Sequence, residues 1–133
     1  FSCVDIDTLC RKSDIITLHT PLNEGTKHLI NKDRLLMMKE SAILVNVARG
    51  LVTDEEAVSE AILNRKIAGF GTDVFSTEPY PENHCFKRIA NCKNVILTPH
   101  MAWGAYDARQ RCISEIAENI KAFYKGEIRN RVD

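Results

Sequence analysis

AILVNVARG, residues 42–50, contains a mostly apolar stretch from Ala42 to Val47 that predicts a buried strand. Apolar side chains occupy both faces of this strand, a pattern typical of a sheet that helices cover on each side. The strand leads into Arg49 and Gly50, so an arginine is expected close to its carboxyl end. This segment therefore predicts an α/β fold, and the flanking sequence extends the same pattern in both directions.

One further strand and two short helices are expected before residue 42. Asp7 can cap a helix at residues 8–12, and the apolar run 15–18 predicts a strand. After a loop, Asn31 can cap a second short helix that leads back to the sheet. The order helix, strand, helix, strand thus precedes Arg49.

A third strand and a longer helix are expected after Gly50. Thr53 and Glu56 form a capping box, which predicts a helix over residues 54–64. The third strand lies around residues 70–75 and starts with two glycines in the sequence GFG, which suggests a bulge or a close approach. This GFG is not a dinucleotide-binding fingerprint, because the third glycine and the following helix are absent.

The last third of the chain contains a loop, a strand and the longest helix. Residues 76–93 hold two prolines and predict a surface excursion without regular structure. NVIL at 94–97 predicts a fourth strand, which Pro99 terminates. Apolar residues at helical spacing then predict a helix over 105–125 that stops at Gly126.

Strands that alternate with helices predict one doubly wound, parallel sheet with right-handed crossovers, and 133 residues suit one domain. The carboxyl ends of parallel strands share one rim, where ligands of open α/β sheets bind. The residues expected on this rim are Thr20, Pro21, Arg49, Asp73, Glu78 and His100.

The rim residues suggest a chemistry when they are taken together. An arginine can hold a carboxylate, a histidine can donate a proton, and a second carboxylate can pair with the imidazole. Each could instead be an ordinary strand-end residue: a solvated arginine, a turn glutamate or a loop histidine. Their joint placement favours the reduction of a 2-oxo acid.

Composition argues against several other classes of protein. Lys plus Arg and Asp plus Glu both number 18, without a basic block, so the electrostatic footprint of a nucleic-acid-binding protein is missing. The five cysteines form no CxxC pair and no zinc-like cluster with histidine, so we expect no metal and reduced thiols in a cytoplasmic protein. No apolar run approaches the roughly 18 residues of a membrane span, and no leader opens the chain.

Four ordered stretches resemble the D-isomer-specific 2-hydroxyacid dehydrogenase family. They are SDIITLHTPLNEGTKHLIN at 13–31, AILVNVARG followed by DEEAV at 42–58, GTDVFSTEP at 71–79 and NVILTPHMAW at 94–103. The resemblance covers essentially the whole chain and implies an oxidoreductase that transfers a hydride between a nicotinamide cofactor and a small D-2-hydroxy acid.

The resemblance also implies a role for each rim residue. His100 would be the general acid and base, Glu78 its hydrogen-bonded partner, and Arg49 the residue that holds the substrate. The expected cofactor contacts, to NAD with NADP not excluded, come from Thr20, Pro21, Ala48 and Asp73.

Within the family, Trp103 and the stretches PENHCF at 81–86 and ARQRC at 108–112 look most like glycerate dehydrogenases, which reduce hydroxypyruvate. An alternative is a corepressor of the C-terminal-binding-protein type, which shares the fold and the arginine, glutamate and histidine. It would serve as a nucleotide-gated interaction module, and the PENHCF stretch argues against it.

The resemblance places this chain in the C-terminal part of a longer enzyme. Residues 1–104 would be the C-terminal portion of a Rossmann-type NAD-binding domain, and residues 105–133 a helix and tail that return to the substrate domain. The family's GxGxxG turn and its ribose-binding acidic residue would precede residue 1. We expect the parent to be a homodimer that binds a small 2-hydroxy or 2-oxo acid, and the isolated chain to be inactive.

Overall fold

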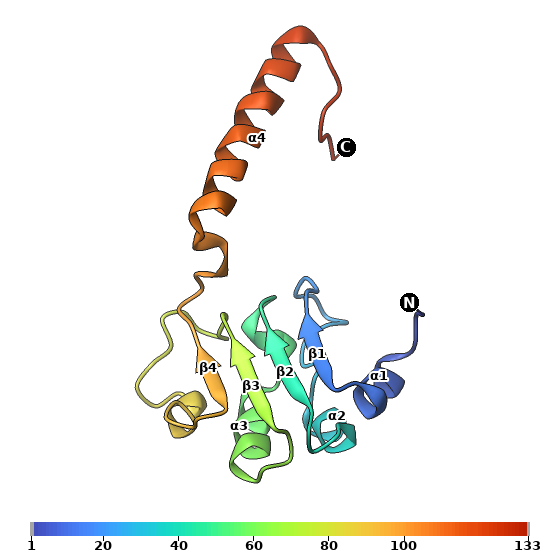
Figure 1. Cartoon of the computed structure of the whole chain (residues 1–133), viewed down its shortest axis with the longest axis vertical. Coiled ribbons are helices and arrows are strands. Elements are labelled where there is room, and N and C mark those ends of the chain that lie inside the picture. Colours follow the sequence, from blue (N-terminus) through green and yellow to red (C-terminus); the bar gives the residue numbers. More distant parts are fainter. Residues whose placement is uncertain (1, 133) are drawn as a thin grey trace. The chain divides into compact units, whose positions relative to one another are not determined.

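The computed structural model describes residues 2–132 and divides the chain into two compact units, of which the first ends at His100 and the second begins at Met101. The first unit is a parallel sheet with helices, and the second contains one long helix (Figure 1). The fold is therefore the α/β fold, a partial Rossmann-type sheet followed by a long C-terminal helix, that the sequence predicts.

Four strands form the sheet in the order β1-β2-β3-β4, and all three neighbouring pairs are parallel. The strands are β1 Ile15–Leu18, β2 Ile43–Asn46, β3 Gly69–Thr72 and β4 Val95–Leu97. The helices of this unit are α1 Ile6–Lys12, α2 Lys32–Met37 and α3 Glu55–Leu63, with short 3₁₀ helices η1 Gly50–Val52 and η2 Cys85–Arg88. All four expected strands and the long helices are thus confirmed.

Only one face of this sheet is covered within the described residues. The register aligns Ile16 with Leu44 and Phe70, all of which are buried in a common core with α2, α3 and η2. On the opposite face Ile15 and Ile43 are exposed, as is Ile96 of β4. Strands added in sequence order through right-handed crossovers place every connecting helix on the same side, so the expected second helical layer is not met here.

Two expected helix caps are wrong by one or two residues. Asp5, not Asp7, caps α1 by accepting from the Thr8 N–H, because the helix starts at Ile6. Asp54 caps α3 by accepting from the Ala57 N–H. The Thr53 hydroxyl instead donates to the carbonyl of Gly50, so the predicted capping box does not form.

The segment 76–93 is more ordered than the sequence suggests. It contains η2, and its Phe86 and Ile89 are fully buried in the core. The two glycines of β3 lie in a regular ladder, where a Cβ would have at most moderately tight contacts. The close approach occurs at Gly50, where a Cβ would lie 2.0 Å from the carbonyl carbon of Phe75.

The second unit consists of the 3₁₀ helix η3 Ala102–Gly104 and α4 Tyr106–Lys125. Gly126 ends α4 in the left-handed region with φ of 72°, as expected for a C-terminal glycine. Several apolar side chains on α4 are exposed: Ile113, Ile116, Ile120, Phe123 and Tyr124. None of the helices within residues 2–132 combines the length and the apolar composition of a membrane span.

Candidate active site

The carboxyl ends of the parallel strands carry the predicted site residues along one edge of the sheet. Arg49 follows β2, Asp73 follows β3, and His100 follows β4. Thr20 and Pro21 follow β1 at the same edge. The topology therefore brings these residues to one rim, as the strand ends predict.

His100 and Glu78 form a hydrogen-bonded pair, in which Nδ1 of His100 lies 2.7 Å from Oε2 of Glu78. The other oxygen of Glu78 accepts from the Phe75 N–H at 2.9 Å. The hydrogen bond from His100, and then that from Phe75, hold the pKa of Glu78 below its usual range. An ionised carboxylate only accepts hydrogen bonds, so Nδ1 of His100 carries the proton between them.

The backbone of His100 adopts a φ of 51°, in the left-handed region that residues with a side chain rarely occupy. A backbone in this region costs about 1–2 kcal/mol, and functional sites are where such costs are often found. The pair also borders a hollow of about 300 Å³ lined by Phe75, Pro79, Tyr80 and Lys87. The imidazole thus stands at the edge of a cavity.

Arg49 lies in a turn that a buried asparagine organises. Asn46, the last residue of β2, accepts from the Ala48 N–H at 3.0 Å and donates to the Arg49 carbonyl at 2.9 Å. The guanidinium of Arg49 donates to the Ala48 carbonyl at 2.7 Å. Asn46 is not among the residues predicted for the site, although a polar residue inside an otherwise apolar strand is a visible signal in the sequence.

Asp73 is almost fully buried at the end of β3. Its Oδ1 accepts from the Thr98 hydroxyl at 2.6 Å, which ties the end of β3 to that of β4. This position is compatible with the predicted cofactor contact, which stays a prediction.

A second hollow, of about 620 Å³, opens beside the ends of β1 and β2 and is lined by His19, Thr20, Pro21, Leu22, Val47, Ala48 and Arg49. The hydroxyl of Thr20, which is one of these residues, is buried and has no hydrogen-bond partner among the described residues. Buried polar groups are normally satisfied, so this hydroxyl fits a site that a polar ligand completes. Three of the four predicted cofactor contacts, Thr20, Pro21 and Ala48, border this hollow.

The structure brings some predicted residues together more directly than others. His100 and Glu78 are in contact, and Thr98 joins Asp73 to the strand that delivers His100. Arg49 lines the larger hollow, whereas His100 and Glu78 line the smaller one. Gly50, the residue after Arg49, packs against the backbone of Phe75 and Ser76. This contact links the turn that contains Arg49 to the segment that leads to Glu78.

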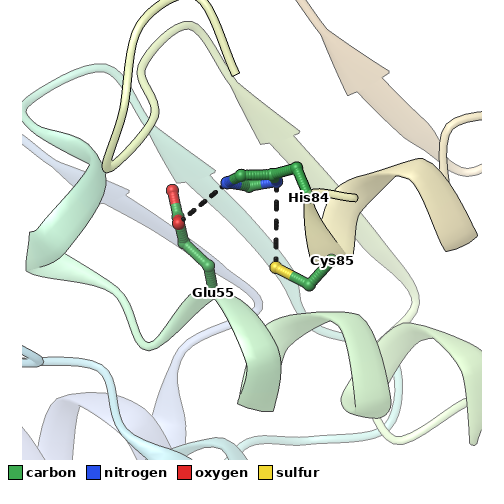
Figure 2. A group of neighbouring side chains, drawn as sticks. All are labelled: Glu55, His84 and Cys85. Atoms are coloured by element: carbon green, nitrogen blue, oxygen red, sulfur yellow. Dashed lines mark hydrogen bonds and ion pairs between the residues drawn. The ribbon is translucent and has the colours of Figure 1, made fainter. Parts of the chain in front are cut away.

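One group of potential metal ligands includes Glu55, which accepts from the Ser76 N–H two residues before Glu78. The ligand atoms of Glu55, His84 and Cys85 lie within 4.8 Å of one another (Figure 2). Both carboxylate oxygens of Glu55 and both ring nitrogens of His84 already have hydrogen-bond partners, and burial raises the pKa of the Cys85 thiol. The cluster is therefore a hydrogen-bonded one, and the expectation of no metal stays a prediction.

Comparison with known proteins gives the family. Residues 1–102 match the family described as D-isomer specific 2-hydroxyacid dehydrogenase, NAD binding domain. The chain belongs to this family. Its resemblance to the family, predicted from four stretches of sequence, is thus confirmed.

Similar members of the dehydrogenase family include glyoxylate reductase from Thermofilum pendens, 47% identical over 124 residues, which are 93% of this chain and 36% of that protein. Glycerate dehydrogenase from Methylorubrum extorquens is 41% identical over 130 residues, 98% of this chain and 41% of that protein. The NAD-complexed D-isomer specific 2-hydroxyacid dehydrogenase from Lactobacillus delbrueckii ssp. bulgaricus superimposes with a TM-score of 0.86 at 30% identity, over 98% of this chain and 43% of that one. The chain thus spans about two-fifths of the length of these dehydrogenases.

Proposed function

We propose that the protein containing this chain is an NAD-dependent oxidoreductase that interconverts a small D-2-hydroxy acid and its 2-oxo acid. The observation that carries this proposal is the pairing of His100 with Glu78 at 2.7 Å, on the same sheet edge as Arg49. The family supports the same activity. The names of the relatives favour an enzyme over the corepressor alternative.

His100 is the proposed proton donor and acceptor. Its Nδ1 is turned to Glu78, so Nε2 is the ring nitrogen that would meet the substrate oxygen. During reduction Nε2 would give its proton to the oxygen that becomes the hydroxyl group, and during oxidation it would take that proton back. The hydrogen bond to Glu78 would fix the plane of the ring.

Arg49 is the proposed anchor for the substrate. A guanidinium binds a carboxylate through two parallel hydrogen bonds, which fixes both the position and the orientation of a 2-oxo acid. Asn46 supports this role because it holds the turn in which Arg49 lies. Orientation matters here because only one face of the 2-oxo carbon would be presented for reduction.

Thr20, Pro21, Ala48 and Asp73 would hold the nicotinamide cofactor. The hollow that Thr20, Pro21 and Ala48 line, and the buried Thr20 hydroxyl without a hydrogen-bond partner, support this assignment. When bound, NAD supplies or accepts the hydride.

The proposed substrates are hydroxypyruvate and glyoxylate, in keeping with the names of the relatives. The full-length protein should oxidise NADH with either acid, and a panel of 2-oxo acids followed by NADH absorbance tests this. No turnover of both, together with good turnover of a bulky aliphatic 2-oxo acid, would reject this substrate class. Failure of the whole panel would reject the activity.

We also propose a homodimer in the cytoplasm. The five free cysteines support a reducing compartment. The assignment of residues 105–133 to an arm that returns to a substrate domain belongs to the same proposal. Light scattering on the full-length protein tests the oligomeric state.

A further inference from the structure

The carboxylate of Glu55 bridges the two ends of the loop that carries Glu78. Glu55 is the first residue of α3 and is nearly buried. One of its oxygens accepts from the Ser76 N–H at 2.8 Å, and the other lies 3.1 Å from Nε2 of His84. Ser76 lies in the segment after β3, four residues past its end at Thr72, and His84 directly precedes η2. Figure 2 shows the Glu55 carboxylate turned towards the His84 ring.

The hydrogen bonds of His84 fix which ring nitrogen carries its proton. The Phe86 N–H donates to Nδ1 at 3.2 Å, so Nδ1 must be the acceptor. Nε2 therefore carries the proton and donates it to Glu55. The ring is also packed between aromatic neighbours, with centroid distances of 5.2 Å to Tyr80 and 5.1 Å to Phe86. His84 is thus held by hydrogen bonds at both nitrogens and by contacts around the ring.

The bridged loop determines where Glu78 lies. Glu78 follows Ser76 by two residues, and its own carboxylate spans from the Phe75 N–H to His100. The start of the loop is therefore fixed by two carboxylates, Glu55 on Ser76 and Glu78 on Phe75. Its far end is fixed by the bond between Glu55 and His84.

We propose that Glu55 and His84 are positioning residues that hold the Ser76–His84 loop in the arrangement where Glu78 reaches His100. They act through Glu78 and touch neither substrate nor cofactor. The importance of this role for turnover rests on the proposed function, whereas its effect on the pairing of Glu78 with His100 does not.

Two substitutions remove the bridge from opposite sides. In Glu55→Gln the side-chain amide can accept a hydrogen bond only through its oxygen. Its NH₂ group must then face either the Ser76 N–H or the proton on Nε2 of His84. One of the two hydrogen bonds of Glu55 is lost in either orientation. In His84→Phe the aromatic packing is retained while both hydrogen bonds are lost. Glu56→Gln is the matched control, because Glu56 is the next residue of α3 and pairs with the exposed Arg88 instead.

The decisive measurement is the titration of the Glu78 carboxyl group in the full-length protein, followed by ¹³C NMR after glutamate labelling and assigned with Glu78→Gln. In the wild type the hydrogen bond from His100 holds the pKa of Glu78 below its usual range. Glu55→Gln and His84→Phe should both raise that pKa towards the usual range, and Glu56→Gln should leave it unchanged. An unchanged Glu78 titration in the two bridge variants overturns the proposal.

Kinetics on the same variants test the consequence for turnover. We expect kcat to fall about 10- to 100-fold in both bridge variants with little change in KM, since proton transfer matters in the transition state. The double variant should lose no more than the worse single one, because both residues form one bridge. Additive losses of kcat in the double variant, or a higher KM with unchanged kcat, would contradict a positioning role.

The two proposals fail in different ways. If the wild type turns over no 2-oxo acid, the proposed function is wrong, and the Glu78 titration still decides whether the bridge positions this carboxylate. If both bridge variants fail to fold while Glu56→Gln folds, the cluster serves stability in general and the positioning assignment is overturned.

Discussion

The single residue with the strongest local evidence for a function is His100. It combines a left-handed backbone, a carboxylate partner at 2.7 Å and a position at the border of a hollow. The sequence predicts its location because Pro99 ends the preceding strand. The distance to Glu78 depends on the loop from Phe75 onwards, and no local pattern predicts it.

His100→Ala in the full-length protein should lower kcat by about 10²- to 10⁴-fold, the usual contribution of a positioned acid or base. KM should change much less, because the proton is transferred only on the way to the transition state. Arg49→Ala should damage both parameters, since Arg49 would bind substrate as well as orient it. Steady-state kinetics with a 2-oxo acid checks this, and near-normal kcat in His100→Ala would remove its assigned role.

The pKa of Glu78 gives a pH dependence with a defined sign. Because the folded state lowers this pKa, the stabilisation from Glu78 is present above the usual glutamate range of about 4.3 and is lost as pH falls through the lowered value. The difference in unfolding free energy between the wild type and Glu78→Gln should therefore be constant at neutral pH and shrink under acid conditions. Urea denaturation at several pH values over this range measures the difference in unfolding free energy. A difference that grows as pH falls would contradict the predicted direction.

Gly50 is the glycine where a side chain has no room. A Cβ there would lie 2.0 Å from the Phe75 carbonyl carbon and 2.2 Å from the Ser76 nitrogen. Gly50→Ala should lower the unfolding free energy by about 1–3 kcal/mol and shift the loop that carries Glu78. Gly71→Ala is the matched control, because its Cβ would find only ordinary contacts at 3.9 Å. Equal denaturation midpoints for the two variants would contradict this explanation.

At the scale of elements, the caps and the 3₁₀ helices are where local patterns and structure differ most. By sequence, Thr53 satisfies the requirements of a helix cap. Its hydroxyl instead donates to the Gly50 carbonyl in η1, and its backbone forms a β-bridge with Ile30. Asp54, one residue later, is then left to cap α3. Short elements such as η1 and η2 bury few residues of their own, so their formation depends on packing against the sheet.

Asp54→Ala should therefore lower the unfolding free energy by about 1 kcal/mol, the usual cost of losing a helix cap. Asp54→Ser should retain most of the stability, because a serine hydroxyl can also accept from the Ala57 N–H. Thermal denaturation of both variants makes the comparison. An Asp54→Ala protein as stable as the wild type would mean that the carboxylate contributes nothing as a cap.

At the scale of the whole molecule, the isolated chain leaves two apolar regions of its sheet uncovered. β1 lies at the edge of the sheet, and the run Ile15–Leu18 carries no charge or proline that would discourage pairing. One face of the sheet also exposes Ile15, Ile43 and Ile96. The parallel doubly wound folds to which this sheet belongs normally cover both faces with helices.

We therefore expect the isolated 133-residue chain to self-associate through β1 and the open face. Ile15→Lys should reduce this association, because a charge on an edge strand opposes pairing with another strand. Leu63→Lys is the control, since it adds the same charge to an exposed apolar position at the end of α3. Light scattering at high concentration checks the result, and a monomeric wild-type chain would contradict the expectation.

The sequence by itself determined the four strands, their order with the helices, the long C-terminal helix and the residues at the strand ends. These follow from apolar runs, prolines and glycines, which act within a few residues of the chain.

The tertiary structure decided which residues meet. Glu55 binds His84 across 29 positions and Glu78 meets His100 across 22, and neither separation leaves a periodic signal in the sequence. The local sequence therefore predicts a surface loop around His84, whereas packing against Tyr80 and Phe86 buries the His84 side chain. The open face has the same origin. The consecutive apolar residues of β2 show that both faces are apolar, but only the direction in which the strands are added decides which face the helices cover.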